Sequence, residues 1–322
     1  MSTTPPPRIQ ARSHEDLLAA VPCLLGFHPA DSLVFVFARD CRVAVTGRID
    51  LDAVLDTDEA ALADLADYLD HVVHTSGADQ VSLISYGDDL DLGLDALRIA
   101  DELSPVPVAD CIHATDTHFW AACCADDPMP EPYDARAHRV TAEAVVAGVP
   151  MLPNREAVAQ LAQGPDPDDP ICVAAEAAAT RQLLDHSPEQ NIALLESLVL
   201  GHLHDPASMD ATTCALAALL VRDIPCRDAA WLLMERADAH LHIALWSRIV
   251  QHTLPQWQVA PLCLLGLAAW IDGSGALLVE CVKRALAADP DYSLAQLMDD
   301  LQRRAIPPQC WEELRRTMQR TL

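Results

Sequence analysis

The chain has 322 residues, a length that favours two domains, and 51% of them are hydrophobic, enough to build two cores. Its formal net charge of −27 repels phosphate backbones and anionic lipids, so we expect no direct binding of nucleic acid or membrane. No apolar run has the length of a membrane-spanning helix, and the first residues lack the apolar segment of a signal peptide. We therefore expect a cytoplasmic protein whose cysteines are reduced.

The acidic charge is concentrated in the first half of the chain. Residues 1–170 contain nine Arg and no Lys against 30 acidic residues, which gives −21, whereas residues 171–322 carry −6. Such a field speeds the approach of a basic protein surface. The alternative is a solvated acidic surface that only keeps the protein soluble.

Residues 32–51 predict a β-hairpin. The apolar run "SLVFVFA" (32–38) is typical of a fully buried strand, and "RVAVTGRIDL" (42–51) alternates between apolar and polar residues. Gly47 interrupts this alternation and predicts a β-bulge.

The following residues alternate between helical and strand-like patterns. Apolar residues at helical spacing follow a candidate N-cap among residues 56–58 and stop at Gly77. Together with the hairpin, the later segments predict an α/β domain over residues 15–165, with a mixed sheet of about five strands and helices. These later segments are a strand at 80–87, a helix at 88–103, and strands at 106–115 and 118–124.

The segment "GPDPDDP" (164–170) reads as a linker, and after it the pattern is only helical. Apolar residues recur every three to four positions, which predicts an all-helical domain of stacked helix hairpins over residues 170–322. One stretch, residues 261–290, fits the tetratricopeptide pattern at Leu265-Gly266, Ala285 and Pro290 but lacks its Trp and Tyr. An irregular helical domain is the alternative.

Three segments carry a resemblance to a known family. They are "LLGFHPADSLV" (24–34) with "RIDL" (48–51), "AGVPMLPNREAVAQL" (147–161) and the long stretch from residue 261 to residue 298. The sequence resembles a family of actinobacterial proteins known only as a domain of unknown function. The resemblance covers nearly the whole chain, and it implies no activity.

The opening motif places His28, Asp31 and Ser32 directly before a buried strand. One interpretation is structural, because Pro29 restricts the backbone and Asp31 or Ser32 can accept backbone N–H groups in a turn. The catalytic alternative makes Ser32 a nucleophile and His28 its base, although the Gly-x-Ser-x-Gly elbow is absent and the Ser precedes a strand.

Arg48 and Asp50 are the further polar residues that this alternative would bring to the same site. A second cluster, Asp88, Asp89 and Asp91, follows the strand at 80–87 and could hold a divalent cation at the edge of the sheet. Acidic residues also favour a helix N-terminus, which is the alternative here. The sequence has neither a phosphate-binding nor a dinucleotide-binding glycine motif, and we predict no cofactor.

Two functional hypotheses remain open. The first is a non-enzymatic binding or scaffold protein that contacts a protein partner or a second copy of itself. The second is a hydrolase or a small-ligand or nucleotide-binding enzyme with a site near the first strand. The missing catalytic motifs and the stacked helix pairs favour the first.

Overall fold

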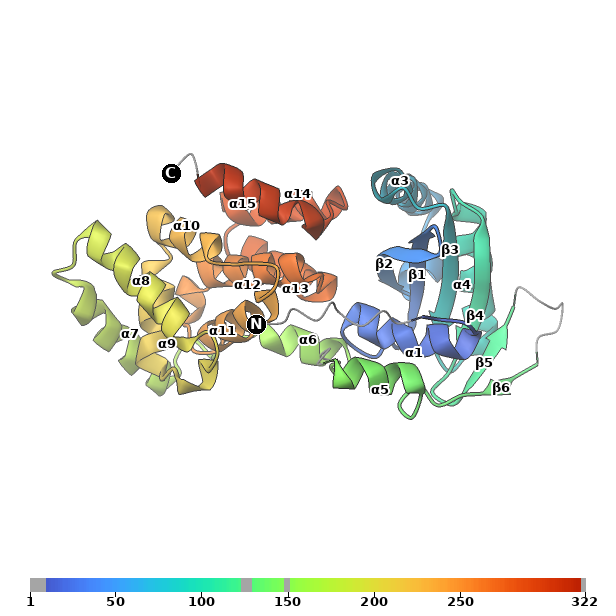
Figure 1. The fold of residues 1–322 in the computed structure, drawn as a ribbon, viewed down its shortest axis with the longest axis horizontal. Coiled ribbons are helices and arrows are strands. Elements are labelled where there is room, and N and C mark those ends of the chain that lie inside the picture. Colours follow the sequence, from blue (N-terminus) through green and yellow to red (C-terminus); the bar gives the residue numbers. More distant parts are fainter. Residues whose placement is uncertain (1–9, 123–128, 148–150, 320–322) are drawn as a thin grey trace. The chain divides into compact units, whose positions relative to one another are not determined.

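The computed structural model describes residues 10–122, 129–147 and 151–319 (Figure 1). The chain forms two compact units, residues 1–155 and residues 156–322. The first contains a sheet with helices, and the described part of the second contains helices only, as the sequence predicts. The sequence predicts the boundary between the two parts at residues 165–170, which is one short helix after the division at residue 155. That each part folds on its own stays a prediction.

The sheet of the first unit has six strands in the order β2-β1-β3-β4-β5-β6. Only β3 and β4 pair in parallel, and the other neighbours are antiparallel. The sixth strand was not predicted, because it has only two residues and one of them is a proline. The strands are β1 (Ser32–Arg39), β2 (Arg42–Asp50), β3 (Gln80–Tyr86), β4 (Val108–Ala114), β5 (His118–Ala121) and β6 (Glu131–Pro132).

The hairpin of β1 and β2 turns at Asp40 and Cys41, which both have positive φ, as two-residue turns between strands require. The predicted bulge at Gly47 is wrong, because the register shifts between Phe37 and Ala38 instead. The shift places Ala38 opposite Val43, and Gly47 keeps its place in the ladder opposite Phe35. Gly47 breaks the sequence alternation only because it has no side chain.

Helices cover both faces of this sheet. The helices of this unit are α1 (His14–Leu25), α2 (Asp52–Leu55), α3 (Glu59–Ser76), α4 (Leu90–Leu103) and α5 (Arg139–Val146). Leu18 and Val21 of α1 pack with Val34 and Ile84 in one buried cluster, and α5 lies beside α1. Full burial of each such side chain contributes about 1.5–3 kcal/mol. His113 lies between Ile112 and Ala114 of this cluster in β4, so its side chain points to the opposite face of the sheet. There it packs against Gly93 of α4, so α4 covers that face.

The ends of α3 follow the sequence prediction. Asp58 is the N-cap and accepts a hydrogen bond from the Ala61 N–H at 2.9 Å, and Gly77 ends the helix in a left-handed conformation with φ of 65°. These caps satisfy backbone groups that the helix itself leaves unpaired.

The second unit has ten helices among the described residues. They are α6 (Arg155–Leu161), α7 (Pro170–Leu183), α8 (Pro188–His202), α9 (Ala211–Leu220), α10 (Ile224–Leu232), α11 (Ala239–Val250), α12 (Val259–Asp272), α13 (Gly275–Ala288), α14 (Ser293–Arg303) and α15 (Trp311–Gln319). Helices α12 and α13 pair as a hairpin over the residues that fit the tetratricopeptide pattern. Gly266 permits this close packing, because a Cβ there would lie 3.1 Å from the Cys281 Cβ.

The tryptophans of the second unit contribute to its core. Trp246 and Trp311 are fully buried. The ring centroids of Trp231 and Trp270 lie 6.0 and 6.2 Å from the ring centroid of Trp311. The Trp311 Nε1–H also donates to the Met234 carbonyl at 2.9 Å. Among the described residues, no helix is both long and apolar enough to span a membrane.

Candidate functional site

The structure brings together the first two sequence segments that carry the family resemblance, the opening motif and the segment around Leu152. Phe27 and Leu152 form a parallel β-bridge. The Leu152 N–H donates to the Gly26 carbonyl at 2.8 Å, and the His28 N–H donates to the Leu152 carbonyl at 3.2 Å. We call residues 26–32, 48–51 and 152–155 the motif junction.

The turn at the start of the motif junction follows from its residues. Gly26 ends α1 with φ of 80°, and its N–H donates to the Pro22 carbonyl. Asp31 has φ of 44°, a left-handed conformation that Asp adopts more readily than most residues. The Leu51 N–H donates to the Asp31 carbonyl at 3.1 Å and joins the turn to the end of β2. The structural interpretation expected the side chain of Asp31 or Ser32 to accept a backbone N–H in this turn, whereas here the backbone carbonyl of Asp31 is the acceptor.

Arg48 and Asp50 belong to one ion-pair network. Arg48 Nη1 lies 2.6 Å from Asp50 Oδ1, and Arg48 Nη2 donates to the Ala30 carbonyl at 3.2 Å. Arg155 Nη1 lies 3.2 Å from Asp50 Oδ2. The Arg48 side chain is only 11% exposed but the Asp50 side chain is 57% exposed, so solvent screens this pair. Sequence reasoning missed Arg155, although it lies in a segment that carries the resemblance.

Ser32 lies directly opposite Tyr86 in the antiparallel pair of β1 and β3. Both side chains are buried, and neither hydroxyl has a hydrogen-bond partner among the described residues. Burial, and to a smaller extent the nearby Tyr133 hydroxyl, raise the pKa of Tyr86 well above its usual value. The Tyr86 hydroxyl therefore stays protonated and can donate a hydrogen bond. Two buried polar groups at one place each lack the partner that buried hydroxyls normally have.

His28 lies among further polar residues at the carboxyl ends of β3 and β4. Burial and the positive charge of Arg136 lower the pKa of His28, and Asp116 opposes them. The Tyr133 hydroxyl donates to the Thr115 carbonyl at 2.7 Å. Burial and the charge of Asp116 raise the pKa of Tyr133 to about 12. Open α/β sheets bind ligands at this edge.

The motif junction does not contain an assembled nucleophile. In a serine hydrolase the hydroxyl and its base lie within hydrogen-bond distance. Ser32 Oγ has no such partner in the described part of the chain, and its side chain is fully buried.

A second polar pair, which sequence reasoning missed, lies on the opposite face of the sheet. Ser85 Oγ is 2.9 Å from His113 Nδ1, on paired residues of β3 and β4. Gly93 of α4 packs on this ring, because a Cβ there would lie 2.0 Å from Nδ1. Burial lowers the pKa of His113, and Asp89 opposes this effect. Both side chains are inaccessible, so the pair is part of the core.

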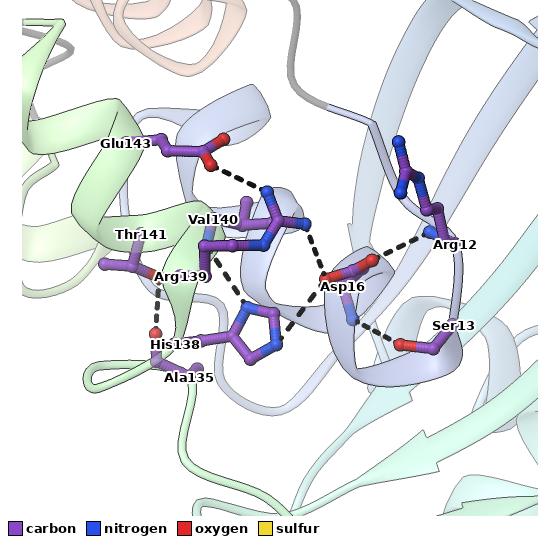
Figure 2. Close-up of polar contacts among 9 residues, drawn as sticks. All are labelled: Arg12, Ser13, Asp16, Ala135, His138, Arg139, Val140, Thr141 and Glu143. Atoms are coloured by element: carbon purple, nitrogen blue, oxygen red, sulfur yellow. Dashed lines mark hydrogen bonds and ion pairs between the residues drawn. The ribbon is translucent and has the colours of Figure 1, made fainter.

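Asp16 forms the polar cluster of Figure 2, which joins α1 to α5. It accepts hydrogen bonds from the Arg12 N–H at 2.9 Å and from Arg139 Nη2 at 3.3 Å, and His138 Nε2 lies 3.5 Å away. His138 Nδ1 accepts from the Val140 N–H at 3.3 Å. Since both nitrogens of His138 have partners, this cluster is structural.

The predicted metal residues lie at the start of α4. Asp89 is the N-cap and accepts from the N–H groups of Asp91 and Leu92 at 3.0 and 3.2 Å. The Asp88 side chain is exposed. In the described ranges, no group of three or more His, Cys, Asp or Glu side chains is arranged to hold a metal ion. The geometry matches the helix N-terminus alternative.

A third feature is a run of exposed carboxylates without any Lys or Arg between Arg48 and Arg98. Helices α2 and α3 each contact α4, so these residues share one region of the first unit. We call this region the acidic surface. Its members are Asp52, Asp56, Asp58, Glu59, Asp64, Asp67, Asp70, Asp88, Asp89, Asp91 and Asp95, all of them exposed.

A family model described as a domain of unknown function, DUF4192, matches residues 15–309. No curated protein and no solved structure matches the chain.

Proposed function

Because the chain belongs to DUF4192, a family whose function is unknown, we propose a role from its own surface: a non-enzymatic binding protein that holds a basic protein partner on the acidic surface. The observation that carries this proposal is the run of exposed carboxylates from residue 52 to residue 95, a stretch that contains no Lys and no Arg. Like charges gathered in this way destabilise the folded state, and a basic partner relieves that repulsion.

Apolar side chains within the acidic surface support a protein partner rather than a small cation. Tyr68 of α3 is 43% exposed and Leu92 of α4 is 48% exposed. Aromatic and aliphatic groups surrounded by charge are common anchors in interfaces. A basic segment would pair its charges with the carboxylates and bury these two side chains.

The same charge opposes nucleic acid and anionic membranes as partners. The described cysteines are all free, which agrees with a reducing compartment. We therefore propose a cytoplasmic location, and the sequence resemblance supports an actinobacterial origin. Self-association is the other form that this scaffold role can take.

The proposal can be tested by selecting peptides from a random library, in which basic sequences are not favoured beforehand. A library of random displayed peptides is selected on the full chain, and we expect enrichment of Arg-rich and Lys-rich peptides whose binding weakens as salt rises. The triple variant Asp64→Asn, Asp67→Asn and Asp70→Asn should bind the selected peptides more weakly.

The matched control makes the same change of charge in the second unit, at Asp185, Asp205 and Asp291, which are also exposed. It should leave binding nearly unchanged. Enrichment of peptides without basic residues, or equal loss of binding in both triple variants, would contradict the proposal.

A small-ligand site at the motif junction is the second candidate function. It is favoured by the buried hydroxyls of Ser32 and Tyr86, which lack partners in the described residues. A small molecule with a carbonyl or hydroxyl acceptor would accept from Tyr86, whose pKa keeps it protonated.

Thermal-shift screening with polar metabolites tests this second candidate. A ligand at a concentration one hundred times its Kd stabilises a protein by about 2.7 kcal/mol. A true ligand should raise the Tm of the natural protein and lose this effect in Tyr86→Phe. A screen without hits, or hits that Tyr86→Phe leaves unchanged, would count against it.

A further inference from the structure

Two histidines lie among the carboxylates of the acidic surface. Helix α3 carries His71 and His74, and both side chains are exposed. Each follows an exposed aspartate by four residues, with Asp67 before His71 and Asp70 before His74. Residues four apart are neighbours on the surface of a helix. The acidic surface therefore contains two positions at which an imidazole can pair with a carboxylate.

The charge of these histidines decides whether the pairs form. Histidine is the side chain whose charge ordinarily changes between pH 5 and pH 8. A protonated imidazole would pair with the aspartate one turn before it, and helices favour this order of acid and base. His74 lies in the last turn of α3, where the helix dipole also favours a positive charge. Protonation would therefore neutralise carboxylates that a basic partner contacts.

The elements that pack most closely against α3 add no further group that titrates in this range. Helix α3 contacts α4 and β2, and neither contains a histidine. Their arginines and carboxylates ordinarily keep their charge between pH 5.5 and pH 7.5. His113 lies beneath α4 and is fully buried, so it does not reach the surface. The charged residues of the two elements are Arg42, Arg48 and Asp50 in β2 and Asp91, Asp95, Arg98, Asp101 and Glu102 in α4.

One further positive charge lies at the end of α3. The Arg39 guanidinium packs beside Gly77, because a Cβ there would lie 2.9 Å from Arg39 Nη1. This charge is the same at every pH of interest, since arginine does not lose its proton in proteins. It contributes a constant term, and the change with pH comes from the histidines.

We propose that His71 and His74 make binding on the acidic surface depend on pH, so that the basic partner is held more tightly at pH 7.5 than at pH 5.5. This inference rests on the proposed function and adds the regulation of the same surface. At the lower pH, two carboxylates of α3 are paired within the helix and two positive charges face the partner. By linkage, a partner that prefers the neutral histidines must release protons when it binds.

The experiment measures binding of a synthetic peptide of alternating Arg and Ser, with both ends blocked, to the full chain. Arginine keeps its charge over this pH range, so the peptide itself does not titrate. At low salt, we expect the natural protein to bind the peptide about threefold or more weakly at pH 5.5 than at pH 7.5. Circular dichroism at both pH values establishes that the chain is folded in each measurement.

Two double variants fix the charge of the histidines. His71→Gln with His74→Gln keeps both positions neutral, and its affinity should change by less than about 1.5-fold between the two pH values. His71→Arg with His74→Arg keeps both positions positive, so it should bind weakly at both. The matched control, His186→Gln with His204→Gln, removes two exposed histidines of the second unit and should retain the natural pH dependence.

Calorimetry at pH 6.5 gives a second readout. Binding to the natural protein should release protons, so the measured heat should vary with the ionisation enthalpy of the buffer. The double Gln variant of α3 should release nearly none. Equal proton release in both proteins would overturn the proposal.

The outcomes separate this inference from the proposed function. Suppose the peptide binds at pH 7.5 and the triple Asn variant of α3 weakens it. If the natural protein then binds equally well at both pH values, or the double Gln variant keeps the natural pH dependence, the regulation is wrong and the acidic surface stands. If neither this peptide nor any basic peptide from the selection binds at pH 7.5, both proposals fail.

Discussion

The two units of this protein use their sequences in opposite ways. The second unit gathers five of the six tryptophans, and two of these, Trp246 and Trp311, are fully buried. The first unit instead exposes a series of carboxylates from residue 52 to residue 95, a stretch without Lys or Arg. Aromatic content therefore marks a core here, and acidic charge marks the exposed surface of the first unit.

The largest effect should come from the tryptophan core. Trp311→Ala removes a fully buried ring and its hydrogen bond to Met234, and we expect a loss of about 3–5 kcal/mol of unfolding free energy. Chemical denaturation followed by circular dichroism measures this loss. Leu184→Ala is the control, since Leu184 is 74% exposed, and it should change stability by less than about 0.5 kcal/mol. Equal effects would contradict the role of the tryptophans as a core.

The next effect concerns the packing of α4 on the sheet. Gly93→Ala would place a Cβ 2.0 Å from His113 Nδ1, so the ring or the helix must move, at a cost of about 1–3 kcal/mol. Gly201→Ala in α8 is the matched control, because no atom lies within 4 Å of that position. It should stabilise the protein by about 0.4–1 kcal/mol. The two substitutions should therefore shift Tm in opposite directions.

The sequence predicted the order of elements well because periodicity and caps are local. Asp58 and Gly77 limit α3 where the pattern indicates. Contacts between residues that are far apart in the chain could not be predicted from these local patterns. The contact of Ser85 with His113 depends on the parallel register of β3 and β4, and the Arg155–Asp50 pair joins residues that are far apart in the chain. The candidate site could be assigned only in part, since spacing revealed Arg48 and Asp50 but not Tyr86.

A smaller effect should appear as a dependence of stability on pH. Burial lowers the pKa of His113 in the folded state, so the unfolded state binds its proton first as pH falls. This contribution is fully present above the unfolded pKa of about 6.5 and is lost below it, at up to about 1.4 kcal/mol per pH unit. Burial lowers the pKa values of His28 and His242 in the same way.

The His113→Gln variant isolates the contribution of His113 to this pH dependence. Denaturant unfolding between pH 7 and pH 5 should show a shallower loss of stability in this variant than in the natural protein. The same slope in both proteins would show that His113 does not titrate with the folding transition.

The smallest effect separates the two candidate functions of the first unit. Tyr86→Phe removes a buried hydroxyl that has no partner among the described residues, so the ligand-free protein should stay within about 1 kcal/mol of the natural stability or become more stable. Its benzene ring keeps the contacts with the cluster that includes Val34 and Phe119. Binding of basic peptides to the acidic surface should not change, because Tyr86 faces α1 and not α4. A loss of more than about 2 kcal/mol in thermal unfolding of the purified protein would instead mean that the hydroxyl already holds a bound group, and the motif junction would then become the leading site.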